Sequence, residues 1–177
     1  MLFRLIVSNL PKGIRKTAMT YYKDLTPYEY FARHEPPVLR GERMLTTLNV
    51  GWLSGNKFYS KGETSQEFKD TLFQLCLDEY IVNIARGFHV CELCRDISYE
   101  QWCIPRYGEK THWLNIGTGE IRVIGQSAIY AAPTLIYHYV VEHQYKPPDE
   151  FIEAVVTGPS PESEEYQALR RKFHSFK

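Results

Sequence analysis

Apolar positions recur at helical spacing in two stretches of the sequence, and each stretch predicts one long helix. The first begins at a capping box formed by Thr64 and Glu67, and it is expected to reach Ile84 and stop at Gly87, a residue that suits a helix C-cap. Its apolar stripe consists of Phe68, Leu72, Leu75, Cys76 and Tyr80. The second helix is expected to open at residues 131–133 and to close at the two prolines of residues 146–148. Its buried stripe is Leu135, Ile136, Tyr139 and Val140.

Shorter patterns between these helices predict strands and turns. The Gly-Thr-Gly run at residues 117–119 is typical of a hairpin turn, so residues 113–116 and 120–124 are expected to pair as antiparallel strands. The remaining expectations are a short helix that begins at residues 26–29, a strand at 48–53 with a turn at 54–56, loop over most of 97–110 and a short helix from residue 149. Helices and strand pairs follow one another without a regular βαβ order, so the predicted class is α+β with short antiparallel strand pairs.

Length and composition narrow the range of protein classes. The chain has 177 residues, of which 44% are hydrophobic and 14% aromatic, and this excludes a disordered or fibrous protein. Twenty-one basic and 21 acidic side chains balance, which argues against binding to nucleic acid or to an anionic membrane surface. No apolar run approaches the roughly 20 residues of a membrane span. One α+β domain is expected over residues 19–157, followed by a charged, helix-permissive tail at 158–177.

The first 18 residues are basic and contain no acidic side chain. Arg4 interrupts their apolar stretch, and no small-residue cleavage site follows, which argues against a secretory signal peptide. We therefore expect residues 1–18 to be a loosely packed N-terminal extension, with Met19 as an alternative natural start.

The sharpest chemical motif is a pair of cysteines, Cys91 and Cys94, separated by two residues. Two thiolates at this spacing can turn around one ion in a zinc knuckle, and a tetrahedral zinc then needs two further ligands. His138 and His143 are spaced as in Cys₂His₂ sites, although the long gap from Cys94 to His138 indicates a site embedded in a domain rather than a separate zinc finger.

The two histidines do not share a face of an ideal helix. Five residues at about 100° each place His138 and His143 about 140° apart, so they converge only where the helix ends before Pro147. Glu142 shares a face with His138 more naturally, and His89 can share a strand face with Cys91. Either residue therefore remains an alternative ligand.

Other interpretations of the cysteine pair also remain open. Cys91 and Cys94 could be inert core thiols or a redox pair, although the βαβ setting of a thioredoxin-like motif is absent. A catalytic metal would need an open ligand position and a base, for which Glu92 and Glu142 are candidates, but no metalloprotease or deaminase motif accompanies them. Cys76 and Cys103 are interpreted as core residues.

Four sequence blocks resemble a family of uncharacterised bacterial proteins that are short and single-domain. The blocks are DLTPYEY at 24–30, NVGWL at 49–53, RGFHVCELC at 86–94 and YAAPTLIYHYVVEHQYKPPDEF at 130–151. The resemblance covers about residues 21–156 and implies no activity. It does imply that the tryptophan-bearing strand, the cysteine pair and the histidine segment belong to one domain.

These observations together predict a cytoplasmic, zinc-stabilised binding or adaptor domain rather than an enzyme, with another protein as its partner. The alternatives are a metal-assisted hydrolase at the same Cys/His site and a thiol-redox protein that uses Cys91 and Cys94.

Overall fold

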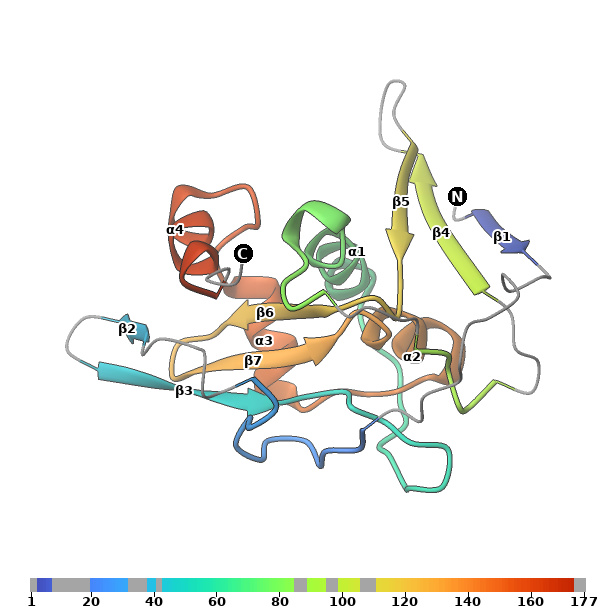
Figure 1. The fold of residues 1–177 in the computed structure, drawn as a ribbon, viewed down its shortest axis with the longest axis horizontal. Helices are drawn as coiled ribbons and strands as arrows, with labels where there is room; N and C mark the ends of the chain where they lie inside the picture. The colour runs from blue at the N-terminus through green and yellow to red at the C-terminus, as the bar shows by residue number, and fades with distance from the viewer. Residues whose placement is uncertain are drawn as a thin grey trace.

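The computed structural model describes residues 3–7, 20–31, 38–40, 43–84, 89–94, 99–105 and 111–173. In these residues the strands are β1 (Phe3–Val7), β2 (Val38–Arg40), β3 (Arg43–Asn49), β4 (Tyr99–Pro105), β5 (Thr111–Asn115), β6 (Glu120–Ile124) and β7 (Ala128–Pro133). The helices are α1 (Gln66–Leu75), α2 (Ile136–His143), α3 (Asp149–Thr157) and α4 (Glu164–Phe173), with a 3₁₀ turn at Asp78–Tyr80 (Figure 1). The predicted α+β class is confirmed, although the helices are shorter than expected.

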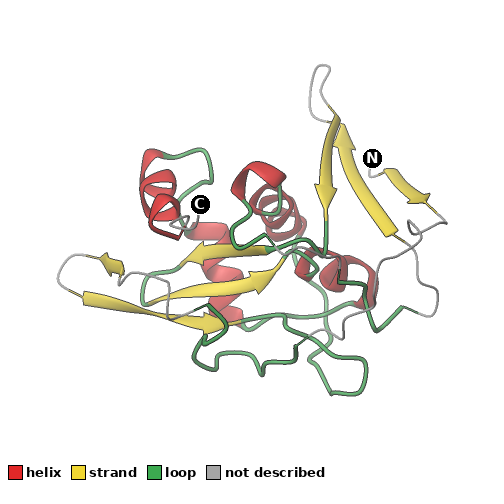
Figure 2. Ribbon diagram, in the orientation of Figure 1, coloured by secondary structure: helices red, strands yellow, loops and turns green. Residues whose placement is uncertain are grey.

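The strands form two sheets, which Figure 2 shows as separate groups. One sheet has the order β2-β3-β7-β6, and in it β3 and β7 run parallel while the other neighbours are antiparallel. The other sheet, of order β1-β4-β5, is antiparallel throughout. Antiparallel strand pairs are therefore present, as predicted, whereas the parallel pair of β3 and β7 was not predicted. Every residue of β6 and β7 is buried, as is typical of strands that are covered on both faces.

The predicted hairpin around residues 117–119 is wrong, because β5 and β6 belong to different sheets. The backbone of Glu120 instead exchanges two hydrogen bonds with Val82, at 2.8 and 2.9 Å. Gly117, with φ +82°, turns the chain between the sheets, and its carbonyl accepts a bond from the His89 N–H. Strand β6 thus begins against the segment after α1 rather than against β5.

Helix α1 begins close to the predicted position and ends well before Ile84. Ser65 caps it, since the Ser65 hydroxyl accepts a 3.1 Å bond from the Phe68 N–H, one residue later than the expected Thr64 cap. The helix ends at Leu75, and Leu77 and Ile81, on either side of the 3₁₀ turn, have extended backbone. Burial of Ile81 and Val82 beside β6 replaces further helical turns, which explains the early end. The predicted stop at Gly87 lies outside the described residues.

The helix predicted to begin at residues 26–29 does not form. Pro27 bridges Leu48 of β3, and the Tyr28 N–H donates to the Thr47 carbonyl at 2.9 Å. The Thr26 hydroxyl bonds back to the Lys23 carbonyl instead of capping a helix. Pairing with β3 therefore overrides the local helix signal.

Helix α2 starts later than predicted, because residues 131–133 are the end of β7. The predicted stripe of Leu135, Ile136, Tyr139 and Val140 is nevertheless buried in the core. Strand β4 also replaces much of the loop expected over 97–110. Helix α3 begins at Asp149 as expected, and α4 forms within the tail.

The core lies between the four-stranded sheet and the helices that pack beside it. Helix α1 contacts α2, α3 and β6, and α3 also contacts β6 (Figure 1). Tyr166 of α4 is buried and donates a 3.0 Å bond to the Arg122 carbonyl of β6. The largest cluster of buried side chains therefore joins the predicted domain to part of the predicted tail.

Two further predictions concern the ends of the chain and the membrane. Phe3–Val7 pairs with β4, whereas residues 8–19 lie outside the described residues, so a loosely packed extension over 1–18 stays a prediction. None of the described helices is both long and apolar enough to cross a bilayer.

Candidate metal centre

Four side chains from two distant segments converge at one point. Cys91 and Cys94 approach from a turn, and His138 and His143 approach from α2, so that one potential ligand atom of each lies within 4.8 Å of all the others. Both histidines present Nε2, and these two atoms are 3.1 Å apart. Cys94 Sγ lies 3.2 Å from His138 Nε2 and 3.3 Å from His143 Nε2. Cys91 Sγ lies 3.3 Å from His143 Nε2.

These separations match the size of a tetrahedral zinc site. Zinc bonds of about 2.3 Å to sulfur and about 2.0–2.1 Å to nitrogen give tetrahedral edges of about 3.3 Å between nitrogens and about 3.6 Å between nitrogen and sulfur. The observed 3.1–3.3 Å separations are a few tenths of an ångström shorter. A small outward movement of the side chains would therefore accommodate the ion.

The end of α2 brings the two histidines together. His143 is the last residue of the helix, and Gln144 takes the left-handed conformation with φ 54°. Tyr145 then turns back, and its N–H donates to the Tyr139 carbonyl at 3.0 Å. The predicted end of the helix before Pro147 is thus present, and it places His143 beside the buried His138.

The cysteine turn is held by a neighbouring loop. Glu92, between the two cysteines, accepts bonds through Oε2 from the Ser54 hydroxyl at 3.0 Å and the Gly55 N–H at 2.9 Å. Cys91 and Leu93 also pack against the hydrophobic core. Glu92 therefore fastens the turn to residues 54–55, a role that the sequence analysis did not anticipate.

A polar anchor fixes the segment that follows α2. Asp24 accepts from the Gly51 N–H at 2.9 Å and from the Tyr145 hydroxyl at 2.8 Å. Gly51 has φ +74°, and a Cβ atom built there would lie 2.8 Å from Cδ1 of Ile136, the first residue of α2. Close contact at Gly51 and hydrogen bonding at Tyr145 thus hold both ends of the helix that carries the histidines.

Burial affects the protonation of the Cys91 thiol. Desolvation, with the neighbouring Cys94 as a second cause, raises the pKa of Cys91 to about 12. A partly buried thiol with a raised pKa stays neutral near pH 7 unless a positive charge stabilises its thiolate. A directly bound divalent cation supplies that charge, and it would displace the protons as it binds.

The two alternative ligands lie outside the four-residue cluster. Glu142 is exposed on α2, and His89 lines a separate cavity beside Glu120. In the described part of the chain Cys91 and Cys94 are free cysteines that are not joined by a disulfide. Cys76 is buried in the core, as the sequence analysis expected.

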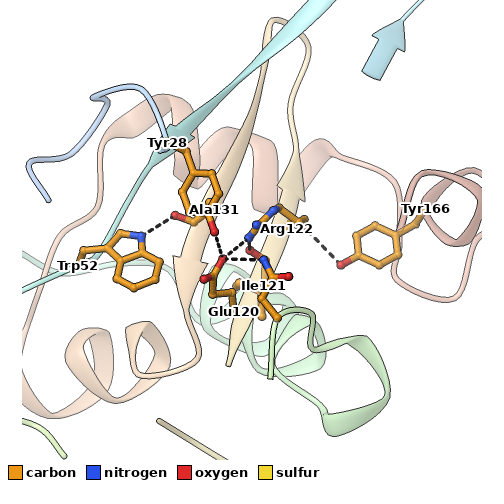
Figure 3. A network of polar contacts seen from close by, with 8 residues as sticks. Tyr28, Trp52, Glu120, Ile121, Arg122, Ala131 and Tyr166 are labelled. Atoms are coloured by element: carbon orange, nitrogen blue, oxygen red, sulfur yellow. Dashed lines mark hydrogen bonds and ion pairs between the residues drawn. The ribbon is translucent and has the colours of Figure 1, made fainter. Parts of the chain in front are cut away.

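A second polar centre was missed by the sequence analysis. Glu120 and Arg122 of β6 are both buried and form a 2.8 Å ion pair, and Tyr28 donates a 2.7 Å bond to the same carboxylate oxygen (Figure 3). The available signal was two opposite charges at alternate positions of an otherwise apolar strand, which places both on one face.

Comparison with known proteins places the chain in a family without adding a function. No match was found among curated proteins or among solved structures. The family described as Domain of unknown function (DUF7919) matches residues 20–156, which include all four residues of the cluster. The chain therefore belongs to the DUF7919 family.

Proposed function

We propose that Cys91, Cys94, His138 and His143 bind one zinc ion that stabilises the domain. Two thiolates and two imidazoles in a tetrahedral arrangement are typical of structural zinc sites, whereas carboxylate and carbonyl oxygens suit magnesium or calcium. The observation that carries the proposal is the convergence of four protein ligand atoms within 4.8 Å. Four protein ligands fill a tetrahedral zinc and leave no position for water.

The surroundings of the cluster support a structural role over a hydrolytic one. Glu92, one of the two candidate bases, already accepts two hydrogen bonds from residues 54–55. Glu142 is exposed on α2 and is not one of the clustered ligands. A metal-assisted hydrolase would need an open coordination position and a base directed at bound water.

The ion would connect two segments that are distant in sequence. Cys94 and His138 are separated by 44 positions, and metal binding adds to the folding free energy when no such site exists in the unfolded chain. The ion would fix the position of the cysteine turn relative to α2, and a partner that contacts both segments would then meet one rigid surface.

The first experiment is elemental analysis of the purified protein by plasma mass spectrometry. We expect about one zinc per chain in the native protein and in Cys76→Ala, and none in Cys91→Ala/Cys94→Ala. Cys76 is the matched control because it is a buried cysteine outside the cluster. Equal metal content in native protein and double variant would overturn the assignment of the site.

Cobalt substitution separates the structural site from its alternatives. A closed site of two sulfurs and two nitrogens should give the intense visible absorption of tetrahedral cobalt, unchanged by added anions such as azide. An azide-dependent spectrum would indicate an open position and favour the hydrolase. If the protein is isolated without metal and Cys91 and Cys94 form a reversible disulfide, these results would favour the thiol-redox protein.

We further propose that the zinc-stabilised domain acts in the cytoplasm as an adaptor that binds another protein. Phe58 supports this, because its side chain is 94% exposed on the loop that Glu92 fastens through Ser54 and Gly55. A photo-crosslinking residue at position 58 should form one discrete adduct in cells, and chelation should abolish it. Absence of any adduct would count against the adaptor role.

A further inference from the structure

A cavity of about 300 Å³ is lined by residues that are different from the four of the candidate metal centre. Its lining includes Glu120, His89 and the aromatic residues Tyr30, Phe31 and Trp52. None of them belongs to the Cys₂His₂ cluster. We call it the Glu120 cavity.

One wall of the Glu120 cavity is polar and is formed by a buried carboxylate. Glu120 is 3% exposed, and its Oε2 accepts bonds from the Tyr28 hydroxyl at 2.7 Å, Arg122 Nη1 at 2.8 Å and Asn83 Nδ2 at 3.3 Å. Figure 3 shows Tyr28 and Arg122 directed at this carboxylate. Within the described part of the chain all three donors use Oε2, so Oε1 remains able to accept a bond from a ligand.

The charge of this carboxylate is already balanced. Arg122 is 1% exposed, and its guanidinium also lies over the Tyr28 ring, 4.7 Å from the ring centre. A ligand therefore needs no positive charge to bind Glu120. It needs an N–H or O–H donor, because an ionised carboxylate is solely an acceptor.

Aromatic side chains form another part of the lining. Tyr30 and Phe31 are in edge contact at 4.6 Å, and Tyr30 lies 6.1 Å from Trp52 between ring centres. The Trp52 indole is held by a 3.0 Å bond from its Nε1 to the Ala131 carbonyl (Figure 3). A wall of several rings, one of them fixed, favours a flat ligand that can stack or make edge contacts.

His89 provides a second polar group in the cavity lining. Its backbone N–H is fixed by the Gly117 carbonyl at 2.9 Å, and the residue lines the cavity. The side-chain Nδ1 is buried, so the imidazole nitrogen left for a ligand is Nε2, which donates or accepts a hydrogen bond according to the tautomer. The cavity thus offers two polar contacts, at Glu120 and His89, beside an aromatic wall.

We propose that the Glu120 cavity binds a small, uncharged, planar heterocycle that carries an amino group. The amino group donates to Glu120 Oε1, a ring nitrogen bonds with His89 Nε2, and the ring lies against Tyr30, Phe31 and Trp52. Aminopyrimidines and aminopurines have this chemistry.

The test uses 2-aminopyrimidine as probe in saturation-transfer and protein-observed NMR titrations of the full chain. A fragment of this size is expected to bind with a dissociation constant of about 1 mM. We expect 2-(dimethylamino)pyrimidine, which has no N–H, to bind at least about fivefold more weakly. Equal binding of the two compounds, or no saturable binding of 2-aminopyrimidine up to about tenfold the expected constant, would overturn the proposal.

Two exposed tyrosines provide a matched pair of variants. Tyr30 lines the cavity and is 49% exposed, whereas Tyr21 is 37% exposed and is not part of the lining. Tyr30→Ala should weaken the probe at least about fivefold and Tyr21→Ala by less than about twofold, with both proteins folded. Equal effects of the two substitutions would contradict the proposed aromatic contact. Benzamidine, which is planar but positively charged, tests the preference for an uncharged ligand, and tighter binding of benzamidine than of 2-aminopyrimidine would contradict that preference.

Discussion

Removal of one metal ligand should lower stability by an amount that follows from the chain length between the ligands. Cys94→Ser replaces a soft sulfur ligand by a hydroxyl, and we expect the remaining three side chains to release the zinc, so that no ion joins the cysteine turn to α2. Cys94 and His138 are 44 positions apart. A cross-link that closes a loop of this length reduces the chain entropy of the unfolded state, which stabilises the folded state by about 4 kcal/mol at 25 °C. We expect at least this loss, which corresponds to a fall of about 8–16 °C in the melting temperature of a domain of this size.

The assay is urea unfolding followed by tryptophan fluorescence, with and without a strong chelator. Chelation should bring the native protein to the stability of Cys94→Ser, while Cys94→Ser itself should not respond to chelator. Cys76→Ala is the control, because it removes a buried thiol that is not a ligand and should lose about 1–2 kcal/mol with the chelator response intact.

Two results would refute this reasoning. An equal response of native protein and Cys94→Ser to chelator would show that any bound metal lies elsewhere. No response in either protein would show that the four side chains stabilise the fold without an ion.

Three further predictions concern the supports of the site. Gly51→Ala should lower the free energy of unfolding in urea by about 1–3 kcal/mol and reduce metal retention. The reason is that φ is +74° and that the new Cβ would lie 2.8 Å from the Ile136 side chain at the start of α2. Unchanged stability and metal retention would contradict this contact. Burial raises the pKa of Asp24, so the folded state keeps this proton to a higher pH than the unfolded state. The free energy of unfolding should therefore fall as the pH rises from about 4 through the raised pKa. Asp24→Asn removes the titrating group and should flatten this fall. Arg122→Met should lower the free energy of unfolding by about 3–5 kcal/mol, because it leaves the Glu120 carboxylate buried without its ion partner. The double variant Glu120→Gln/Arg122→Met should recover much of this stability. A double variant as unstable as Arg122→Met would show that the buried ion pair is not the cause.

The candidate site was predictable because its chemistry depends on residue type and local spacing. Two cysteines separated by two residues form a turn whose sulfurs point the same way, and this holds in many folds. The choice of His138 and His143 over Glu142 and His89 depends on the end of α2 and on the path of the cysteine turn. Sequence spacing left those alternatives open, and the structure assembles the cluster from the first two.

The strand pairing could not be predicted in the same way, because it depends on segments far apart in the chain. Strand β3 pairs in parallel with β7, some 80 positions later, and no local pattern identifies that partner. Residues 26–29 carry a helix-start signal, yet bonds from Tyr28 and Asn49 tie this segment to β3. The Gly-Thr-Gly run does form a turn, but Val82 already occupies the edge of β6 that a hairpin partner would need. Local propensity is a weak determinant where such long-range partners compete.

The order of the metal ligands along the chain has a consequence for synthesis on the ribosome. Cys91 and Cys94 are translated before His138, and at 5–20 residues per second the 44-position gap corresponds to a delay of about 2–9 s. During this interval the two thiols leave the ribosome without their histidine partners, near enough in sequence to be oxidised to a disulfide. The proposed zinc site can close only after α2 emerges, and zinc binding would protect the two thiols from oxidation from that point on.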